Sequence, residues 1–309
     1  MKTVFIDGSA GTTGLRIRER LSARKDISLI TLPEAQRKDA AARKEALNAA
    51  DIAFLCLPDD AAREAVGMIE NEHTAVIDTS TAHRTAKGWT YGFPELFGKR
   101  AEIAASHRIA NPGCHASGFI ALVAPLIRAG LLDADVLLSA FSLTGYSGGG
   151  KKMIAEYKDP ARPLALDAPR QYALSQAHKH LPEMKALCGL QSAPIFSPIV
   201  SDYYAGMEVT VPLFTEMLKG SRADVIDAYR EAYGTGLVRY NANMGEGGFL
   251  GGAAFAGRDD MEIGVLGNDE RMLLVARYDN LGKGASGAAI QNMNILLGAD
   301  EGLGLVIGE

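Results

Sequence analysis

A glycine-rich loop between an apolar strand pattern and an amphipathic helix pattern constrains the fold of this chain more than any other feature. The strand pattern covers Thr3–Ile6, and the helix is predicted over Leu15–Ala23. Between them the glycines follow the spacing GxxGxxG. Gly8 allows a tight turn, Gly11 lets the backbone approach a pyrophosphate, and Gly14 permits close packing of helix on strand. The strand–loop–helix context favours a dinucleotide-binding unit over a plain turn that binds nothing.

Short strands and helices continue to alternate through the first 110 residues, which predicts a doubly wound parallel sheet. The expected strands are Ile27–Leu32, Ile52–Leu57 and Ala75–Ile77, and the expected helices are Arg43–Ala49 and Ala61–Glu70. After a helix over Ala116–Ala129 the strands become longer and more alternating, which predicts a second, α+β domain with an antiparallel or mixed sheet. Its expected strands are Val136–Thr144, Ile195–Val200, Glu208–Phe214 and Leu273–Tyr278, and later helices are expected at Ala223–Ala232 and Ser286–Leu297.

The composition is that of an ordinary globular enzyme, and 309 residues suggest about two domains. With 32 basic and 37 acidic residues the net charge is −5, and no basic stripe is present, so nucleic acid and anionic membranes are not expected partners. There are three cysteines, an odd number without paired spacing, which argues against a disulfide framework. The first expected strand starts at Thr3, with no charged leader before it. No apolar run is long enough to span a bilayer. We therefore expect a soluble, cytoplasmic protein.

The segment Asn111-Pro112-Gly113-Cys114 places a cysteine at the start of a predicted helix. Backbone N–H groups at a helix N-terminus carry partial positive charge and favour a thiolate, which is a nucleophile for acyl groups. A lone cysteine is more often a small buried apolar residue, and Cys56 and Cys188 fit that interpretation. Cys114 differs because its flanks form a turn. Together with the glycine loop, it indicates covalent acyl chemistry coupled to a nicotinamide.

An acyl-transfer thiol needs a group that moves protons, and the segment 178–183 offers two imidazoles. His178 and His180 lie two residues apart, and Glu183 follows just beyond Pro182, where a carboxylate could orient an imidazole. One alternative is that the two histidines bind a metal, but no further ligands stand at zinc-like spacing. The other alternative is a pair of surface histidines without a functional role. His115 follows the nucleophile and is expected to point elsewhere.

The residues after the second strand bear on the choice of nicotinamide cofactor. Glu34 stands where an acid would bind the ribose of NAD, whereas Arg37 and Lys38 could hold the 2′-phosphate of NADP. All three also fit a solvated helix start, and the balance favours NADP. The glycine–lysine segments 144–152 and 281–287 suggest two further anion sites, although glycine runs are also plain flexible turns.

With these motifs the chain resembles the N-acetyl-γ-glutamyl-phosphate reductases of arginine biosynthesis, specifically their shorter, type 2 variant. The resemblance covers nearly the whole chain, and the combination of Asn-Pro-Gly-Cys with His-Lys-His-x-Pro-Glu is its specific part. The matching segments are Gly8–Gly14, Tyr91–Leu96, Asn111–Cys114, Ser147–Gly150, His178–Glu183, Asp279–Leu281 and Lys283–Gly287. The resemblance implies NADPH-dependent reduction of N-acetyl-γ-glutamyl phosphate to N-acetyl-glutamate 5-semialdehyde and phosphate, through a thioester on Cys114.

The resemblance also implies a Rossmann-type domain, residues 1–114 and 284–309, and an α+β domain, residues 115–283, that mediates formation of a homodimer or homotetramer. The catalytic residues it implies are Cys114, His178, His180 and Glu183. The NADP(H)-binding residues we assign are Gly8, Gly11, Thr12, Thr13, Gly14, Arg37, Lys38, Pro58, Ser80, Gly148, Gly149 and Asn280. For the substrate we assign Ser147 and, on charge alone, Arg84 and Arg108; no metal is expected. Two departures are Ala82, where an aspartate is common, and His115, where an aromatic usually follows the cysteine.

Two other functions compete with this interpretation. A sister acyl-phosphate reductase, such as an aspartate-semialdehyde dehydrogenase or an aminoadipate-type reductase, would share the cofactor and the cysteine chemistry and differ in the acyl pocket. A non-catalytic sensor of NADP(H) is the second, but such a sensor needs neither a cysteine at a helix start nor a histidine pair.

Overall fold

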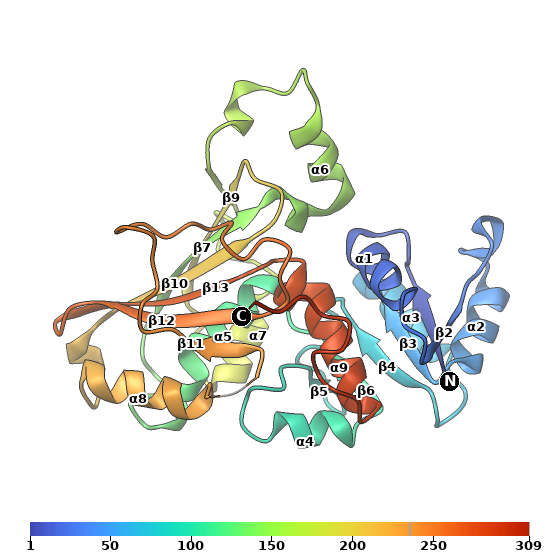
Figure 1. Ribbon diagram of the computed structural model, residues 1–309, viewed down its shortest axis with the longest axis horizontal. Coiled ribbons are helices and arrows are strands. Elements are labelled where there is room, and N and C mark those ends of the chain that lie inside the picture. Colours follow the sequence, from blue (N-terminus) through green and yellow to red (C-terminus); the bar gives the residue numbers. More distant parts are fainter. Residues whose placement is uncertain (235, 309) are drawn as a thin grey trace. The chain divides into compact units, whose positions relative to one another are not determined.

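The computed structural model describes residues 1–234 and 236–308, which form two compact units. Unit 1 contains Met1–Pro94, Gly98–Pro112 and Ala285–Leu305, and unit 2 contains Glu95–Phe97, Gly113–Gly284 and the residues from Val306 onward. The chain thus passes from unit 1 to unit 2 between Pro112 and Gly113, one residue before Cys114, and returns directly after Gly284, ahead of α9 (Figure 1).

Unit 1 contains a six-stranded sheet in which every paired strand runs parallel, in the order β2-β1-β3-β4-β6-β5. Its strands are β1 (Lys2–Asp7), β2 (Ile27–Ile30), β3 (Ile52–Leu55), β4 (Ala75–Asp78), β5 (Thr90–Tyr91) and β6 (Arg108–Ala110). All four residues of β3 and of β4 are buried, as expected for strands covered on both faces. The predicted doubly wound parallel sheet is confirmed.

Helices cover both faces of this sheet, because successive strand residues point to opposite sides. Val4, Phe54 and Ile77 belong to one apolar cluster with side chains of α1 and α9, whereas their neighbours Phe5 and Leu55 belong to a second cluster with α2 and α3. The helices of unit 1 are α1 (Thr12–Leu21), the 3₁₀ turn η1 (Glu34–Gln36), α2 (Ala40–Ala49), α3 (Asp59–Gly67), α4 (Lys99–Ala104) and α9 (Gly287–Leu296). The last helix therefore joins the first sheet from the far end of the chain.

Unit 2 contains a seven-stranded mixed sheet in the order β11-β12-β13-β10-β7-β9-β8. The pairs β7–β9 and β11–β12 are parallel and the other pairs are antiparallel, so the expectation of a mixed sheet is confirmed. Its strands are β7 (Ser139–Gly145), β8 (Arg170–Gln171), β9 (Ile195–Ser201), β10 (Met207–Phe214), β11 (Val238–Tyr240), β12 (Met261–Gly267) and β13 (Arg271–Tyr278).

The central helix of unit 2, α5 (Cys114–Arg128), is apolar on nearly every side and packs against the sheet and two further helices. Pro125 has no N–H to donate to the carbonyl of Ala121, and the Tyr233 hydroxyl donates to that carbonyl instead, at 2.7 Å. Further helices and turns are η2 (Tyr146–Gly149), α6 (Gly150–Lys158), η3 (Leu164–Leu166), α7 (Leu181–Cys188), η4 (Thr215–Met217), α8 (Arg222–Ala232) and a π-helical turn, η5 (Gly282–Ser286).

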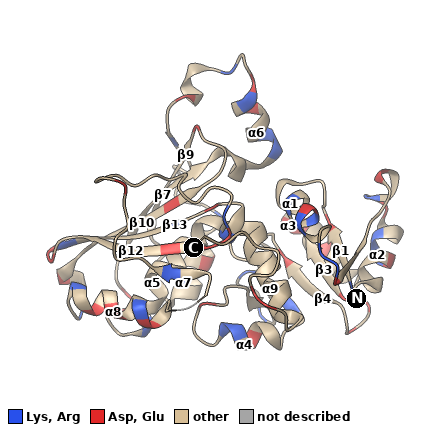
Figure 2. Ribbon diagram, viewed as in Figure 1, with Lys and Arg blue, Asp and Glu red and all other residues tan. Residues whose placement is uncertain are grey.

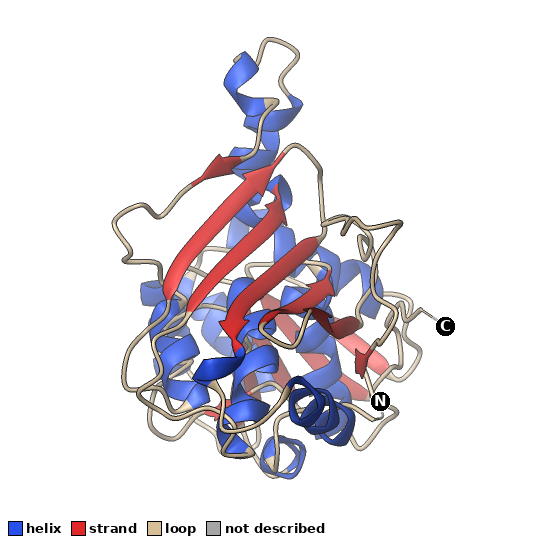
Figure 3. Ribbon diagram, turned by 90° about the vertical axis from the view of Figure 1, so that its left-hand side faces the viewer, coloured by secondary structure: helices blue, strands red, loops and turns tan. Residues whose placement is uncertain are grey.

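The opposite face of the same sheet carries exposed apolar side chains, and Figure 3 shows most of the length of its long strands uncovered. Phe141 is 50% exposed, Ile195 65%, Phe214 60% and Leu273 41%, and strand register places all four on this face. Neither β7 nor β9 contains a charged residue, whereas β10 carries Glu208 and β12 carries Glu262, and Figure 2 shows red on strands of this sheet as well as on helices and loops. We call this surface the open sheet face.

Candidate active site

The glycine loop of unit 1 links the end of β1 to the start of α1, as predicted. Gly8 has φ +86°, and a Cβ there would lie 2.2 Å from the carbonyl oxygen of Cys56. A Cβ on Gly14 would lie 2.5 Å from the Gly8 oxygen, so the helix packs tightly against the loop. At Gly11, the N-cap of α1, an added Cβ meets nothing closer than 3.4 Å. The first backbone amides of α1, at Thr12 and Thr13, have no acceptor within the helix and are of the kind that binds a phosphate.

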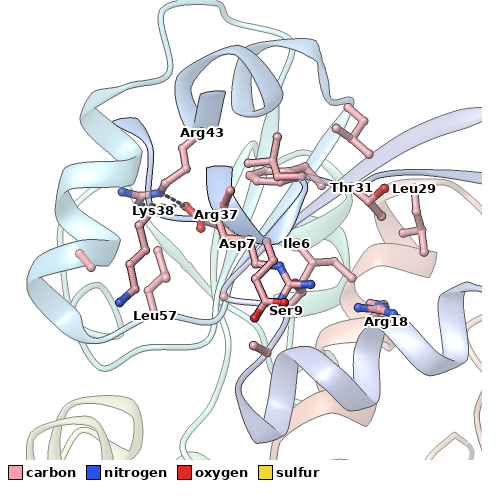
Figure 4. Close-up of a pocket in the computed structure, with 18 residues that line it drawn as sticks. Ile6, Asp7, Ser9, Arg18, Leu29, Thr31, Arg37, Lys38, Arg43 and Leu57 are labelled. Carbon is pink, nitrogen blue, oxygen red and sulfur yellow. Dashed lines mark hydrogen bonds and ion pairs between the residues drawn. The ribbon is translucent and has the colours of Figure 1, made fainter. Parts of the chain in front are cut away.

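A cavity of about 570 Å³ lies beside this loop, at the carboxyl ends of β1 and β2 (Figure 4). Apolar side chains such as Leu29 and Leu57 form part of its wall, next to polar and charged ones. Arg37 and Lys38 both line it, together with Arg18 and the acidic Glu34. The cavity therefore offers an apolar wall for a base and cationic side chains for a 2′-phosphate, which suits NADP(H).

A buried ion pair supports the floor of this cavity. Asp7, the last residue of β1, accepts from Nε of Arg43 at 3.0 Å, and the Nη2 atom of Arg43 lies 2.9 Å from the same oxygen. Burial raises the pKa of Asp7, and the hydrogen bond from Arg43 opposes that rise. Arg43 also lines the cavity but is paired with Asp7, whereas Arg37 and Lys38 come from the loop before α2.

Pro58 and Ser80 follow the neighbouring strands β3 and β4 at the same edge of the parallel sheet. Pro58 is the N-cap of α3 and is exposed. Ser80 is buried and donates to Asp78 at 2.7 Å, and the same carboxylate oxygen of Asp78 lies 2.6 Å from Nδ1 of His83. Both predicted cofactor residues therefore lie at the edge where the glycine loop lies, but the Ser80 hydroxyl is held within its own loop.

The two arginines assigned to the substrate lie at opposite ends of unit 1's strands. Arg84 donates from Nε to the Asn111 carbonyl at 3.0 Å and from Nη2 to the Thr79 carbonyl at 3.2 Å, which ties together the ends of β4 and β6. Arg108 begins β6, at the opposite edge of the sheet, and donates to the carbonyls of Thr74 and His107, each at 2.9 Å. Charge alone misled the assignment of Arg108, because strand direction places it away from the glycine loop.

In unit 2, Cys114 is the first residue of α5, with Gly113 as the N-cap, and its side chain is partly exposed. Two side chains hold this turn in place. The Gly113 N–H donates to a carboxylate oxygen of Glu183 at 3.1 Å, and the Tyr278 hydroxyl donates to the Cys114 carbonyl while accepting from the Gly118 N–H at 3.1 Å. A thiol at this position lies at the positive end of a 15-residue helix.

His178 and His180 lie directly before α7, which packs against α5. Their rings meet edge to face, with centroids 4.7 Å apart, and His180 is buried. Glu183 is also buried, in the first turn of α7, and its bond to the Gly113 amide fixes the turn before the thiol. The structure therefore brings the four predicted catalytic residues together in unit 2, and gives Glu183 a contact with the backbone beside Cys114.

His115 belongs to this cluster, so the prediction that it points elsewhere is wrong. Its ring lies 5.4 Å from the ring of His178 and 5.6 Å from that of His180, centroid to centroid. Nδ1 lies 2.7 Å from the Ser142 hydroxyl and Nε2 lies 2.6 Å from the Tyr172 hydroxyl. Ser142 and Tyr172 come from β7 and from the residue after β8, so no local sequence signal could have linked them to Cys114.

The glycine turn after β7 is held by Asn280. The amide nitrogen of Asn280 donates to the Ser147 hydroxyl at 3.0 Å, and its amide oxygen accepts from the Gly206 N–H at 2.9 Å. Ser147 is buried, whereas Gly148 and Gly149 are exposed in η2. Asn280 and Ser147 thus position this turn, and its two glycines present their backbone to solvent.

The segment 281–287 is not the exposed anion loop that its glycines and lysine suggested. Lys283 is fully buried, and its ammonium lies 2.7 Å and 2.8 Å from the two carboxylate oxygens of Glu95. A Cβ on Gly284 would approach the Cβ of Cys114 to 3.1 Å. The segment therefore forms part of the structural support of the cysteine.

Within residues 1–234 and 236–308, no group of three or more His, Cys, Asp or Glu side chains has the geometry to hold a metal ion. Among the helices in that part of the chain, none is both long and apolar enough to cross a membrane.

Comparison with known proteins defines the class first. Residues 3–105 match the family described as "Semialdehyde dehydrogenase, NAD binding domain", and residues 114–280 match "Semialdehyde dehydrogenase, dimerisation domain". The fold is also that of solved aspartate semialdehyde dehydrogenases. The enzyme II from Vibrio cholerae in complex with ASA superposes with a TM-score of 0.73 at 17% identity, covering 96% of this chain and 98% of that one. The Candida albicans enzyme with NADP superposes with a TM-score of 0.63 at 14% identity, covering 95% of this chain and 98% of that one.

Curated relatives give the particular family. The "N-acetyl-gamma-glutamyl-phosphate reductase 2" of Pseudomonas putida is 47% identical, with 96% of this chain and 97% of the relative covered. The N-acetyl-gamma-glutamyl-phosphate reductase of Brucella anthropi is 48% identical, with 96% of this chain and 98% of the relative covered. The "N-acetyl-gamma-glutamyl-phosphate reductase 2" of a Nostoc species is 44% identical, with 98% of both chains covered. The chain belongs to the N-acetyl-γ-glutamyl-phosphate reductase family, as its motifs indicated.

Proposed function

We propose that the protein reduces N-acetyl-γ-glutamyl phosphate to N-acetyl-glutamate 5-semialdehyde in arginine biosynthesis, with NADPH as reductant and release of phosphate. The observation that carries this proposal is that the rings of His178 and His180 pack against that of His115, the residue after Cys114 at the start of α5, in a chain 44–48% identical to reductases named for this reaction. A cysteine nucleophile with imidazoles nearby is the set of groups that acyl transfer from an acyl phosphate requires.

In the first step the Cys114 thiolate attacks the acyl carbon, the carbon–sulfur bond forms, and the carbon–oxygen bond to phosphate breaks. Charge develops on the carbonyl oxygen during this attack. Backbone N–H groups at the start of α5 would stabilise that charge, an effect worth about 3 kcal/mol in comparable sites. Glu183 and Tyr278 support this role because they hold the backbone of the first turn on both sides of the thiol.

When bound, NADPH supplies the hydride that reduces the acyl group held on Cys114 to the oxidation level of the aldehyde. Release of the semialdehyde then requires two events at this chain's residues. The carbon–sulfur bond breaks so that Cys114 leaves as the thiolate, and the hydroxyl proton of the adduct passes to a base. We assign that base to the His178/His180 pair, because an imidazole gives and takes protons near neutral pH.

For the cofactor we propose a site built on the open edge of the glycine loop. Gly8, Gly11 and Gly14 let the backbone approach the pyrophosphate, and the amides of Thr12 and Thr13 bind it. Arg37 and Lys38 are proposed to hold the 2′-phosphate, since both line the adjacent cavity. We further propose that Pro58, Ser80, Gly148, Gly149 and Asn280 contribute, Ser80 and Asn280 by positioning their loops.

For the substrate we retain Ser147 and Arg84 as proposed binding residues and leave out Arg108, whose guanidinium is bonded to carbonyls at the other edge of its sheet. In functional terms we propose that residues 1–114 and 284–309 bind NADPH and that residues 115–283 bind the substrate and form the oligomer.

We propose that the protein assembles as a homodimer or homotetramer through the open sheet face. Exposed apolar side chains across several strands favour burial against a second copy. A Phe141→Glu/Ile195→Glu variant is expected to elute with a lower mass than the wild type in size-exclusion chromatography with light scattering: as a monomer if the wild type is a dimer, and as a dimer if it is a tetramer. The matched control is Leu164→Glu, a position 86% exposed outside this face. An unchanged mass of the double variant would contradict this assignment. We place the enzyme in the cytoplasm, where reducing conditions keep such a thiol active.

The experiment that tests the proposed reaction is phosphate-dependent reduction of NADP by the purified protein, followed by absorbance of the reduced nicotinamide. N-acetyl-glutamate semialdehyde and aspartate semialdehyde are compared as substrates. Activity with the acetylated substrate alone is the expected result. Activity only with aspartate semialdehyde would move the protein to the sister family, and no activity with either would contradict a catalytic function.

A further inference from the structure

His115 occupies a fully enclosed position between two hydroxyl groups of unit 2. Its Nδ1 lies 2.7 Å from the Ser142 hydroxyl, and its Nε2 lies 2.6 Å from the Tyr172 hydroxyl. The ring is buried, with the edge of Phe196 against it at a centroid distance of 5.3 Å. Both nitrogens of this ring are therefore used inside the protein, which makes His115 a fixed link between β7 and the segment after β8.

The surroundings of His115 keep it uncharged. Burial, with the nearby His178 and Lys179, lowers the pKa of His115 to about 3. A neutral imidazole has one N–H donor and one acceptor nitrogen, so Ser142 and Tyr172 must take opposite roles. If the Ser142 hydroxyl donates to Nδ1, then Nε2–H donates to the Tyr172 oxygen. The Tyr172 hydroxyl hydrogen then remains available to another acceptor.

Tyr172 belongs to the cluster of rings around His115, the residue after Cys114. Its backbone N–H is fixed to the Pro198 carbonyl at 3.0 Å, and its ring lies 5.9 Å from that of His178. Its hydroxyl binds the side chain of the residue that directly follows Cys114. Burial, and after it the negative charge of Cys114, raise the pKa of Tyr172, so the hydroxyl keeps its proton and can donate it in a hydrogen bond.

We propose that His115 is a positioning residue that orients the Tyr172 hydroxyl to donate a hydrogen bond to the sulfur of Cys114. The inference rests on the proposed function in treating Cys114 as the nucleophile. Such a donor stabilises the thiolate twice, as the attacking group and again as the leaving group when the semialdehyde is released. No proton is transferred, since the tyrosine remains a phenol throughout.

Substitutions at His115 separate this role from simple packing. In His115→Gln the side-chain amide reaches the position of Nε2 and can hydrogen-bond to Tyr172. In His115→Asn the amide reaches only the position of Nδ1 and can hydrogen-bond to Ser142 but not to Tyr172. Tyr172→Phe removes the hydroxyl and keeps the ring, so it remains informative if a His115 variant folds poorly. Tyr157→Phe is the matched control, because that hydroxyl accepts from Arg170 at 3.0 Å in the same unit and does not touch His115.

The readout is the rate of Cys114 alkylation by iodoacetamide at fixed pH, with kcat and KM measured in parallel. Tyr172→Phe and His115→Asn are expected to lower the alkylation rate and kcat about tenfold, with little change in KM, whereas His115→Gln and Tyr157→Phe stay near wild type. Equal loss in the Gln and Asn variants, or an unchanged rate in Tyr172→Phe, would overturn the inference. Alkylation does not depend on which acyl phosphate is the substrate. The two hypotheses can therefore fail separately. If the wild type is inactive on the acetylated substrate but the variants show this alkylation pattern, the proposed reaction is contradicted and the positioning role is supported.

Discussion

In unit 1 helices cover both faces of a parallel sheet, whereas in unit 2 helices cover one face of a mixed sheet and apolar side chains stand exposed on the other. The proposed functional groups differ in the same way. Unit 1 offers backbone: a glycine loop that borders a cavity at the carboxyl ends of the strands. Unit 2 offers side chains: a thiol and three histidines around the start of one helix. We therefore expect the backbone site to lose function when a side-chain atom is added to a glycine, and the side-chain site to lose function when a reacting group is removed.

The strongest test of the side-chain half is Cys114→Ala. Loss of the nucleophile is expected to lower kcat by at least about 10⁴-fold, because no second thiol can take its place. Burial raises the pKa of Cys56 to about 12 and also raises that of Cys188, so neither supplies a thiolate at neutral pH. Binding of NADPH, measured by fluorescence titration, should be unchanged. Turnover at the wild-type rate would end the cysteine mechanism.

The corresponding test of the backbone half adds a single carbon, in Gly8→Ala. A Cβ 2.2 Å from a backbone carbonyl oxygen, at φ +86°, forces the loop to move. Because displacement of about 1 Å can cost about a hundredfold, NADPH affinity is expected to fall by about that factor. Gly67→Ala is the control in the same unit, since nothing lies within 4 Å of its Cβ. Equal affinity in the Gly8 variant and this control would refute the cofactor role of the loop.

Deleting two charges tests whether side chains, and not only the backbone, bind the cofactor in unit 1. Removing both cations in Arg37→Ala/Lys38→Ala is expected to raise the KM for NADPH about 30-fold, as loss of a charge-assisted contact does, and to leave the KM for NADH unchanged. Arg63→Ala, on the exposed side of α3, is the control. A parallel rise for both cofactors would mean that these side chains do not read the 2′-phosphate.

The smallest expected effect concerns stability rather than catalysis. Because the pKa of folded His115 is about 3, below that of an unfolded histidine, the unfolded chain binds the extra proton first as pH falls. Stability is therefore lost from about pH 6.5 downward to about pH 3. At pH 5 the loss is about 2 kcal/mol.

Urea unfolding of wild type and His115→Phe at pH 7 and pH 5 measures this difference. The variant should lose about 2 kcal/mol less than wild type between the two pH values. Identical losses would show that His115 does not titrate on unfolding.

Much of the fold could be predicted because its signals are local. The strand Thr3–Ile6 and the helix after it were expected within a few residues of β1 and α1, and the apolar run after Cys114 was expected as α5. Short elements without a clear period, such as β6 and α4, were missed. The helix α6 was missed as well, because glycines and lysines at its start suggested a loop.

Errors about the site arose where the answer depends on distant residues. Arg108 looked like an anion-binding residue until strand direction placed it at the wrong edge of the sheet. Lys283 looked exposed, but Glu95, 188 residues away in the sequence, neutralises it in the interior. His115 looked idle, because its partners Ser142 and Tyr172 come from other strands.

By itself the sequence determined the two-part architecture, the glycine loop and the cysteine at a helix start, since each depends on residues close together in the chain and on their backbone preferences. Only the tertiary structure decided which charges face a ligand, which are paired inside, and which histidines surround the thiol. Those features are set by strand order, register and burial, and side chains brought together from 27 to 188 positions apart leave no periodic signal in the sequence.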